Sequence, residues 1–280
     1  MKVVRILATA LAVATPLAMA AAADIPVEGA VYEPRPVALI FRWTGVYVGL
    51  HAGGGSGFIQ ENSVPFSVPP HALGPFGGAG PGPATLAPLL TRVDIGGGIA
   101  GGQAGLNYQT NWLVVGFEGQ ASWANLNGTT ACVVVASPPV TATGANCTDK
   151  IDALGTAAVR LGVAFDHLLV FDHLLVYGKG GAAWANNGYQ IKINLAPGTL
   201  VFSTNELRWG WMLGIGAEYA FTNNWSTKIE YNYMDMGSHA QRFADSIGGN
   251  ILIDTDIRER LNVVKVGVNY RFGVNPILIK

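Results

Sequence analysis

The sequence has little charge: only 12% of its 280 residues are Asp, Glu, Lys or Arg, and the formal net charge is −1. Proteins that bind nucleic acid usually carry a basic surface, so this charge balance excludes nucleic acid as an expected partner. Half of the residues are hydrophobic, and 37 are glycine. This composition is apolar for a secreted soluble protein and suits a barrel whose outer surface meets lipid.

The sequence beyond residue 23 also lacks a run of about 18 uncharged apolar residues, which is the length that a membrane-spanning helix needs. The nearest candidate, Leu161–Tyr177, is interrupted by Asp166, His167, Asp172 and His173. A helical membrane anchor is therefore not expected, and any crossing of a bilayer would be made by strands.

Residues 1–23 have the pattern of a secretory signal peptide. Lys2 and Arg5 precede a short apolar core, and Ala18–Ala20 matches a cleavage site. We expect this segment to be removed during export. Residues 24–42 contain three prolines and no clean hydrophobic period, which predicts a periplasmic N-terminal tail.

Cysteine is scarce, since Cys132 and Cys147 are the only two. Outside the cytoplasm we expect them to form a disulfide. The bridge would close a loop of about 15 residues and stabilise the fold by roughly 3 kcal/mol. Two free thiols are the alternative. No histidine or third cysteine lies close to them in the sequence, so no metal site is expected.

What the sequence does contain is a strict alternation of apolar with polar or small residues, seen best in Val264–Phe272. Its even positions are Val, Val, Val, Tyr and Phe, whereas its odd positions are Lys265, Gly267, Asn269 and Arg271. This period predicts a strand with one apolar and one polar face. The same reasoning predicts eight strands, at residues 43–52, 93–108, 112–126, 151–164, 174–189, 207–221, 225–237 and 257–272.

Long and short connections alternate between these strands. The long ones are residues 53–90, 127–150, 190–206 and 238–255, of which 190–206 partly continues the strands in an alternative interpretation. Short periplasmic turns and longer outside loops are typical of outer-membrane barrels. We therefore predict an all-β fold: an eight-stranded antiparallel transmembrane up-and-down β-barrel over residues 43–272, with long extracellular loops, short periplasmic turns and a C-terminal extension at 273–280. A soluble periplasmic β protein is the alternative.

One short connection carries a duplication: Phe165–Val170 is repeated letter for letter as Phe171–Val176. Six is an even number, so the repeat preserves which side chains face inward. We predict a lengthened periplasmic turn with the barrel intact. A metal site at the paired Asp-His dipeptides is the less favoured interpretation.

The alternation also sends charged side chains into the barrel. An eight-stranded barrel is only just wide enough for its own side chains, so we expect these charges to form an ion-pair network that fills the interior. A narrow leak with a slight preference for anions is the alternative. The predicted inward charged residues are Glu118, Arg160, Lys179, Glu218, Lys228, Glu230, Lys265 and Arg271.

The glycines and histidines do not indicate an enzyme. Gly96–Gly101 fits G-x-G-x-x-G, but it lies within a predicted strand rather than between a strand and a helix, so no cofactor is expected. His51 and Ser56 are expected near the outer rim of the first strand, and no G-x-S-x-G motif occurs. Loop histidines His71 and His239 are better explained as solvated than as ligands of haem or metal.

Four motifs in order carry a resemblance: Trp43–Gly49, Gly102–Tyr108, Tyr177–Trp184 and Gly267–Phe272. They resemble the small eight-stranded outer-membrane β-barrels of alphaproteobacteria, the opacity-type or porin-like outer membrane immunogenic proteins. The resemblance implies the outer membrane of a Gram-negative bacterium, with membrane lipid and the barrel assembly machinery as partners. It also implies that Tyr270 and Phe272 act as an assembly signal, here followed by extra residues.

These observations predict a mainly structural role in envelope integrity. The four outer loops are expected to meet an external ligand or a host surface. A porin-like channel for passive diffusion of small solutes is the alternative. The oligomeric state is left open by the sequence.

Overall fold

The computed structural model describes residues 41–63, 66–68, 84–86, 90–132, 142–165, 173–195, 198–244 and 252–272. The predicted signal peptide, nearly all of the predicted tail, the C-terminal extension and most of the duplicated segment lie outside these residues. Within the described ranges, no helix has the length and apolar character to cross a membrane.

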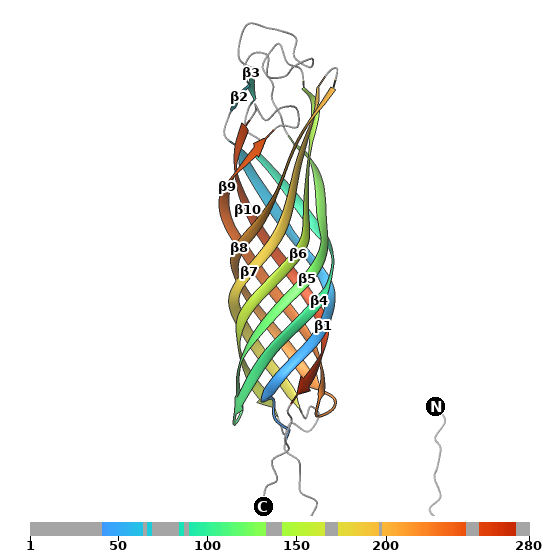
Figure 1. Ribbon diagram of the computed structural model, residues 1–280, viewed down its shortest axis with the longest axis vertical. Helices are drawn as coiled ribbons and strands as arrows, with labels where there is room; N and C mark the ends of the chain where they lie inside the picture. The colour runs from blue at the N-terminus through green and yellow to red at the C-terminus, as the bar shows by residue number, and fades with distance from the viewer. Residues whose placement is uncertain are drawn as a thin grey trace, which may run out of the picture. The chain divides into compact units, whose positions relative to one another are not determined.

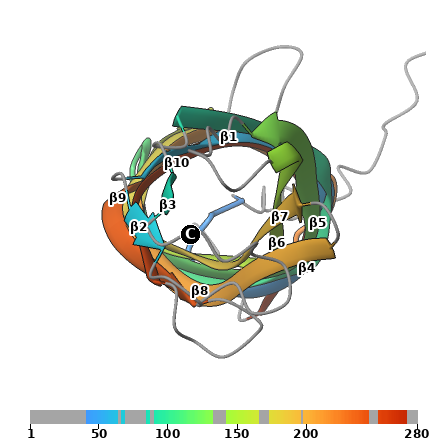
Figure 2. The ribbon, with the colours of Figure 1, turned by 90° about the horizontal axis from the view of Figure 1, so that it is seen from above.

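The described residues form ten strands, eight of which close into one antiparallel barrel (Figures 1 and 2). The order around the barrel is β1-β10-β9-β8-β7-β6-β5-β4, and β2 and β3 form a separate two-stranded sheet. The bounds are β1 Gly45–Ser63, β2 Phe66–Val68, β3 Ala84–Leu86, β4 Leu90–Thr110, β5 Leu113–Cys132, β6 Ala142–Phe165, β7 Leu174–Leu195, β8 Gly198–Ala220, β9 Trp225–Ala244 and β10 Leu252–Phe272.

The first barrel strand closes the ring by pairing on both sides. Val46 of β1 lies opposite Phe272 of β10, and Gly45 lies opposite Asn107 of β4. A closed barrel leaves no strand edge with unpaired backbone groups, which is what a lipid environment demands. The predicted eight-stranded antiparallel barrel is therefore confirmed.

The predicted strand ends at the outer side were wrong, because the strands run further than the sequence suggested. Residues 53–63, 127–132 and 142–150 continue strands rather than forming loops. The β7–β8 ladder reaches Leu195 opposite Gly198, so the alternative interpretation of residues 190–206 is the correct one. Backbone pairing continues above the lipid because each strand still needs partners for its N–H and C=O groups, whatever its outward side chains are.

The outward side chains mark where lipid ends. On β8 they are apolar from Leu207 to Tyr219, and Ile215 has 66% of its surface exposed. Ser203 and Asn205, further along the same face, are polar and exposed. Exposed apolar side chains in the middle of a strand and polar ones beyond them fit an outer-membrane barrel whose strands project past the bilayer.

Candidate functional site

The barrel interior is closed at the end that carries the short turns. Trp43 is 1% exposed, and its backbone N–H donates to Oε1 of Gln109 at 2.6 Å. The Arg271 guanidinium lies 4.5 Å from the ring centre of Phe41 and 4.8 Å from that of Trp43. The first strand was predicted to begin at Trp43, but β1 begins at Gly45, so Trp43 is free of that strand's alternation and lies inside the barrel.

Phe41 and Trp43 are here called the aromatic plug. Above it lies a layer of charged side chains, at the centre of which is Glu118 of β5. Its carboxylate lies 2.8 Å from Nζ of Lys228, 3.1 Å from Nζ of Lys179 and 3.4 Å from Nη1 of Arg160. The Tyr47 hydroxyl donates to it at 2.8 Å. The Glu118 side chain is fully buried, so these partners replace the water that the carboxylate loses.

Two further glutamates complete the layer. Glu218 lies 2.8 Å from Nη2 of Arg160. Glu230 lies 2.6 Å from Nζ of Lys179 and 3.3 Å from those of Lys228 and Lys265. The structure thus joins seven of the eight predicted charged residues into one buried ion-pair network, consisting of Glu118, Arg160, Lys179, Glu218, Lys228, Glu230 and Lys265. Arg271 is buried as well but stacks on the aromatic plug.

His51 is buried, contrary to the position predicted for it. Its Nδ1 lies 2.5 Å from Oε1 of Gln103, and its Nε2 lies 2.7 Å from Oγ of Ser122. Nε2 of Gln103 in turn donates to Oδ1 of Asn269 at 2.6 Å. His51 was expected near the outer rim because β1 was predicted to end at Ala52. The strand continues to Ser63, so His51 lies well below the rim, and the alternation of β1 turns its side chain into the barrel.

An apolar layer, which was not predicted from the sequence, follows above the network. All eight barrel strands contribute inward apolar side chains to this single cluster. A cavity of about 10 Å³ lies where the layer meets Lys265 and Gln120, which is room for about one water molecule. The layer has the packing of a protein core because the closed barrel surrounds it on all sides. Its larger members include Ile59, Ile99, Leu126, Ile151, Met212, Met234 and Leu261, and towards the outer end Tyr189, Ile191, Ile193, Phe202 and Ile257.

The two cysteines form the predicted disulfide, which joins β5 to β6. The Cα atoms of Cys132 and Cys147 lie 5.7 Å apart. They belong to the paired ends of two strands rather than to a loop, and Cys147 lies opposite Thr130 in the ladder. The bridge therefore fastens the outer end of one hairpin.

The residues of the predicted assembly signal lie at the end of β10. The Tyr270 ring centre is 5.1 Å from that of Trp225 and 4.9 Å from that of Phe272. Phe272 is 48% exposed and faces outward. This aromatic group stands at the lipid-facing rim of the barrel, and its role in assembly stays a prediction.

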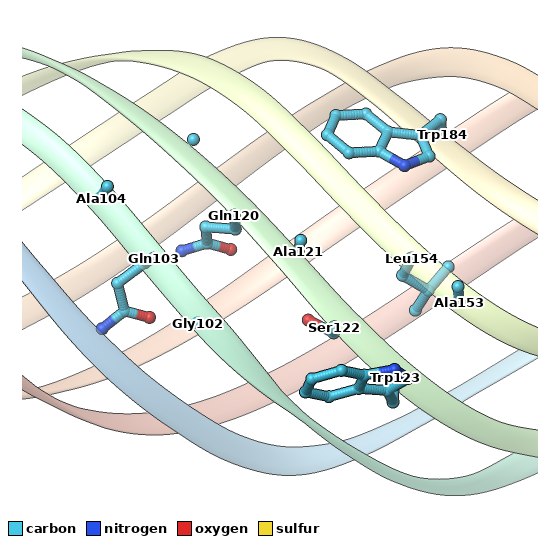
Figure 3. Close-up of a pocket in the computed structure, with 11 residues that line it drawn as sticks. Gly102, Gln103, Ala104, Gln120, Ala121, Ser122, Trp123, Ala153, Leu154 and Trp184 are labelled. Carbon is cyan, nitrogen blue, oxygen red and sulfur yellow. The ribbon is translucent and has the colours of Figure 1, made fainter.

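A groove of about 660 Å³ lies on the outer wall rather than in the interior (Figure 3). Its outward lining includes the small residues Gly102, Ala104 and Ala121, with Trp123 and Trp184 as the bulky ones. Trp123 is 79% exposed, as expected of a lipid-facing side chain. The groove is therefore part of the membrane surface. In the part of the chain that the structure describes, no three His, Cys, Asp or Glu side chains are grouped to hold a metal ion.

Comparison with known proteins agrees with this geometry. The family model described as "Outer membrane protein beta-barrel domain" matches residues 7–272. The 31 kDa outer-membrane immunogenic protein of Brucella melitensis is 29% identical over 233 residues, covering 83% of this chain and 85% of that protein. The 25 kDa outer-membrane immunogenic protein of Brucella abortus is 26% identical over 258 residues, covering 91% and 92%.

Among solved structures, the outer membrane protein OprG of Pseudomonas aeruginosa is similar with a TM-score of 0.43 and 14% identity, over 84% of this chain and 100% of that one. The family match covers nearly the whole chain and ends at the last residue of β10. The chain therefore belongs to the outer membrane β-barrel family and is a protein of the Gram-negative outer membrane.

Proposed function

We propose that this protein is a closed structural barrel of the outer membrane, which supports envelope integrity and presents its outer loops to an external ligand or surface. The observation that carries the proposal is the filled interior. Three layers lie across it in series: the aromatic plug of Phe41 and Trp43, the ion-pair network and the apolar layer. Ions crossing such an interior would have to leave water and break buried pairs, which is costly.

The surface part of the proposal is supported by the strands that project beyond the lipid. The disulfide fastens one of these outer hairpins, which suits a segment exposed to solvent and proteases. The relatives from Brucella are named as immunogenic proteins. An outer region that other molecules can reach is the feature this chain would share with them.

The porin-like alternative has one observation in its favour. The ion-pair network contains four cationic side chains and three carboxylates, so a leak through it would favour anions. Planar-bilayer recording of the refolded full-length chain separates the two functions. We expect no steady channel current from the wild type, because the apolar layer has no room for hydrated ions.

A variant designed to open the interior serves as the matched control. Replacing Met212, Met234 and Leu261 by alanine removes bulk from the apolar layer while keeping the ion-pair network. We expect this variant to conduct measurably where the wild type is silent. Steady wild-type openings whose selectivity changes in Lys265→Gln would overturn the closed barrel and establish a porin.

A further inference from the structure

The barrel wall is not fully hydrogen-bonded in the part of the strands that projects beyond the lipid. The β8–β9 ladder reaches outward only to the pair Trp211–Asp235, although both strands continue well past it. Among the described residues, no backbone pair joins the two strands above that point. Figure 1 shows the outer ends of β8 and β9 diverging. The unpaired edges, residues 198–210 of β8 and 236–244 of β9, are here called the seam.

A bulge in β9 lies at the lower end of the seam. Met236 and Gly237 stand together opposite Glu259, because the register of the β9–β10 ladder shifts between Arg258 and Arg260. Gly237 has a φ of 70°, a left-handed conformation that glycine adopts without strain. A bulge bends its strand and increases the local twist. The local sequence therefore favours the divergence of β9 from β8 at this level.

The outer part of the barrel consists of two lobes. The β4–β5 ladder also stops early, at the pair Gly96–Asn127. By contrast, the β1–β4 ladder continues to Leu90 and the β5–β6 ladder to Cys132. The first lobe is therefore made by the outer ends of β9, β10, β1 and β4, and the second by those of β5, β6, β7 and β8. Within the described ranges, no backbone ladder joins the two lobes above these levels.

Three buried carboxylates lie inside the barrel where the lobes meet. Glu61 of β1 and Glu259 of β10 belong to the first lobe, whereas Asp149 of β6 belongs to the second. They lie within the outer part of the apolar layer, since Ile257 and Cys147, two residues along the same inward faces, are members of it. Each carboxylate is at most 1% exposed. The three are here called the interlobe carboxylates.

The interlobe carboxylates lack the hydrogen bonds that an ionised carboxylate needs. Both carboxylate oxygens of Glu61 and of Asp149, and Oε1 of Glu259, have no partner in the part of the chain that the structure describes. An ionised carboxylate buried without partners is costly. By contrast, every carboxylate of the ion-pair network has a cation within 2.8 Å. The apolar contact between the lobes therefore depends on the interlobe carboxylates being protonated.

Polar contacts across the lobe boundary are made by residues of the second lobe. Nη2 of Arg208 donates to the backbone oxygen of Ile257 at 2.8 Å and lies 3.3 Å from Nδ1 of His239. The amide nitrogen of Asn187 contacts Oε2 of Glu259 at 2.5 Å. His239 is exposed, although its ladder partner Ile257 is fully buried on the same face. Solvent therefore reaches the inner face of β9 beside the seam.

The interlobe carboxylates change their protonation near neutral pH. The outward residues at their level are polar, such as Lys150 and Arg258, so this level lies outside the membrane-spanning part of the strands. Burial raises the pKa of Glu61 and of Glu259 to about 7. Burial, together with the negative charges of Glu61 and Glu259 across the lobe boundary, raises the pKa of Asp149 to about 8.

The surrounding groups add little positive charge. The described inward residues of β4 and β5 at this level are uncharged. Arg208 is the one permanent cation that faces the interlobe carboxylates among the described residues, and it lies 4.0 Å from Oε2 of Glu259. The other titratable groups that face them are Tyr189 of β7, Glu206 of β8 and His239 of β9.

We propose that the outer end of the barrel opens along the seam when the interlobe carboxylates lose their protons, and closes when they regain them. Ionised carboxylates on the two lobes repel each other and need water, which an opened seam admits. Solvated carboxyl groups have an ordinary pKa of about 4. The closed form therefore binds more protons than the open form, and its stability falls as the pH rises from about 4 to about 8.

The opening is confined to the part of the barrel beyond the lipid. The β8–β9 ladder is continuous from Trp211–Asp235 to Ala220–Ser226, which includes the level of the ion-pair network. The network and the aromatic plug stay in place below the seam. The barrel thus changes the shape of its outer surface with pH and forms no channel through the membrane.

Distances between two spin labels across the seam test this proposal, measured by double electron–electron resonance on the refolded full-length chain. The labels are attached at Asn205→Cys on β8 and Ala240→Cys on β9, two exposed positions. Both native cysteines are in the disulfide, so only the introduced ones react. We expect the distance to increase by at least roughly 5 Å, one strand spacing, from about pH 5.5 to about pH 9. An unchanged distance would overturn the proposal.

A label pair within the second lobe is the matched control. Asn146→Cys with Asn205→Cys joins exposed positions on β6 and β8, which are linked through the ladders of β7. Its distance should be the same at both pH values. An equal increase in this pair would mean that the whole outer end loosens, which would contradict opening along the seam.

The triple variant Glu61→Gln, Asp149→Asn, Glu259→Gln removes the titrating groups while keeping the side-chain shapes. We expect its labels across the seam to stay at the short distance at both pH values. Asp94→Asn removes an exposed carboxylate of β4 that pairs with Arg92, so this variant should open as the wild type does. A folded triple variant that still opens at about pH 9 would show that other groups drive the change, and the proposal would fail.

Discussion

At the scale of single residues, the ion-pair network is organised around the side chain with the most charged partners. Glu118 has three cations and the Tyr47 hydroxyl within 3.4 Å. Arg160 links it to Glu218, and its guanidinium stacks 3.8 Å from the ring centre of Tyr177. Because each partner serves two acids or rings, removal of one charge disturbs the whole layer.

We therefore expect Glu118→Gln to lower the free energy of unfolding by about 3–5 kcal/mol, since it leaves the four buried cations of the network with two carboxylates. Asp152→Asn is the control, because its ion pair with Lys150 is about half exposed and should contribute less than about 1 kcal/mol. Urea unfolding in lipid vesicles, followed by tryptophan fluorescence, measures both. Equal changes in the two variants would show that the network has no special role in stability.

At the scale of a strand, the polarity of the outward side chains matches the surroundings of each part of the strand. On β8 the apolar stretch from Leu207 to Tyr219 meets lipid, whereas Asn205 on the same face stands beyond it. Leu213, midway along the stretch, is 57% exposed. The same strand thus crosses two solvents without any break in its hydrogen-bond ladder.

An arginine scan of this face checks the position of the membrane. We expect Leu213→Arg to destabilise the barrel by about 2–4 kcal/mol, the cost of a charge near the bilayer midplane. Asn205→Arg should change stability by less than about 0.5 kcal/mol, because its side chain remains in water. The free energy of refolding into lipid vesicles is the measurement. Similar changes in stability at the two positions would mean that the position assigned to the membrane on β8 is wrong.

At the scale of the whole molecule, the barrel is a closed cylinder with a solid interior and projecting outer strands. It belongs to the outer membrane β-barrel family, and side chains fill its core. The groove on its outer wall and the exposed aromatic rim both face lipid. The proposed envelope role would therefore be exerted through these lipid contacts and the outer end of the barrel.

Cells that lack the gene should accordingly become several-fold more sensitive to detergents and to antibiotics too large for porins. Complementation with the wild-type gene should restore resistance. The Glu118→Gln gene should restore it only in proportion to the amount of folded variant in the outer membrane. The minimum inhibitory concentration in each strain is the measurement. Unchanged sensitivity in the deletion strain would leave surface presentation as the function and remove the envelope role.

The sequence by itself determined the number of barrel strands, their antiparallel order and which side chains within those strands face inward, but it did not predict the short strands β2 and β3. A period of two is a local property, so eight stretches of alternating residues were enough to predict the barrel and the burial of Lys265 and Arg271. The disulfide followed in the same way, from two cysteines in an exported chain. These predictions need no knowledge of which residues meet across the barrel.

The tertiary structure alone decided how far the strands extend, where Trp43 and His51 lie, and which charges meet. The outward side chains stop being apolar where the lipid ends, but backbone hydrogen bonding between the strands continues beyond that level. The partners of Glu118 come from β6, β7 and β9, and the stagger of the closed barrel sets their heights. Local alternation does not encode these contacts across the interior, so they are visible only once the ring is closed.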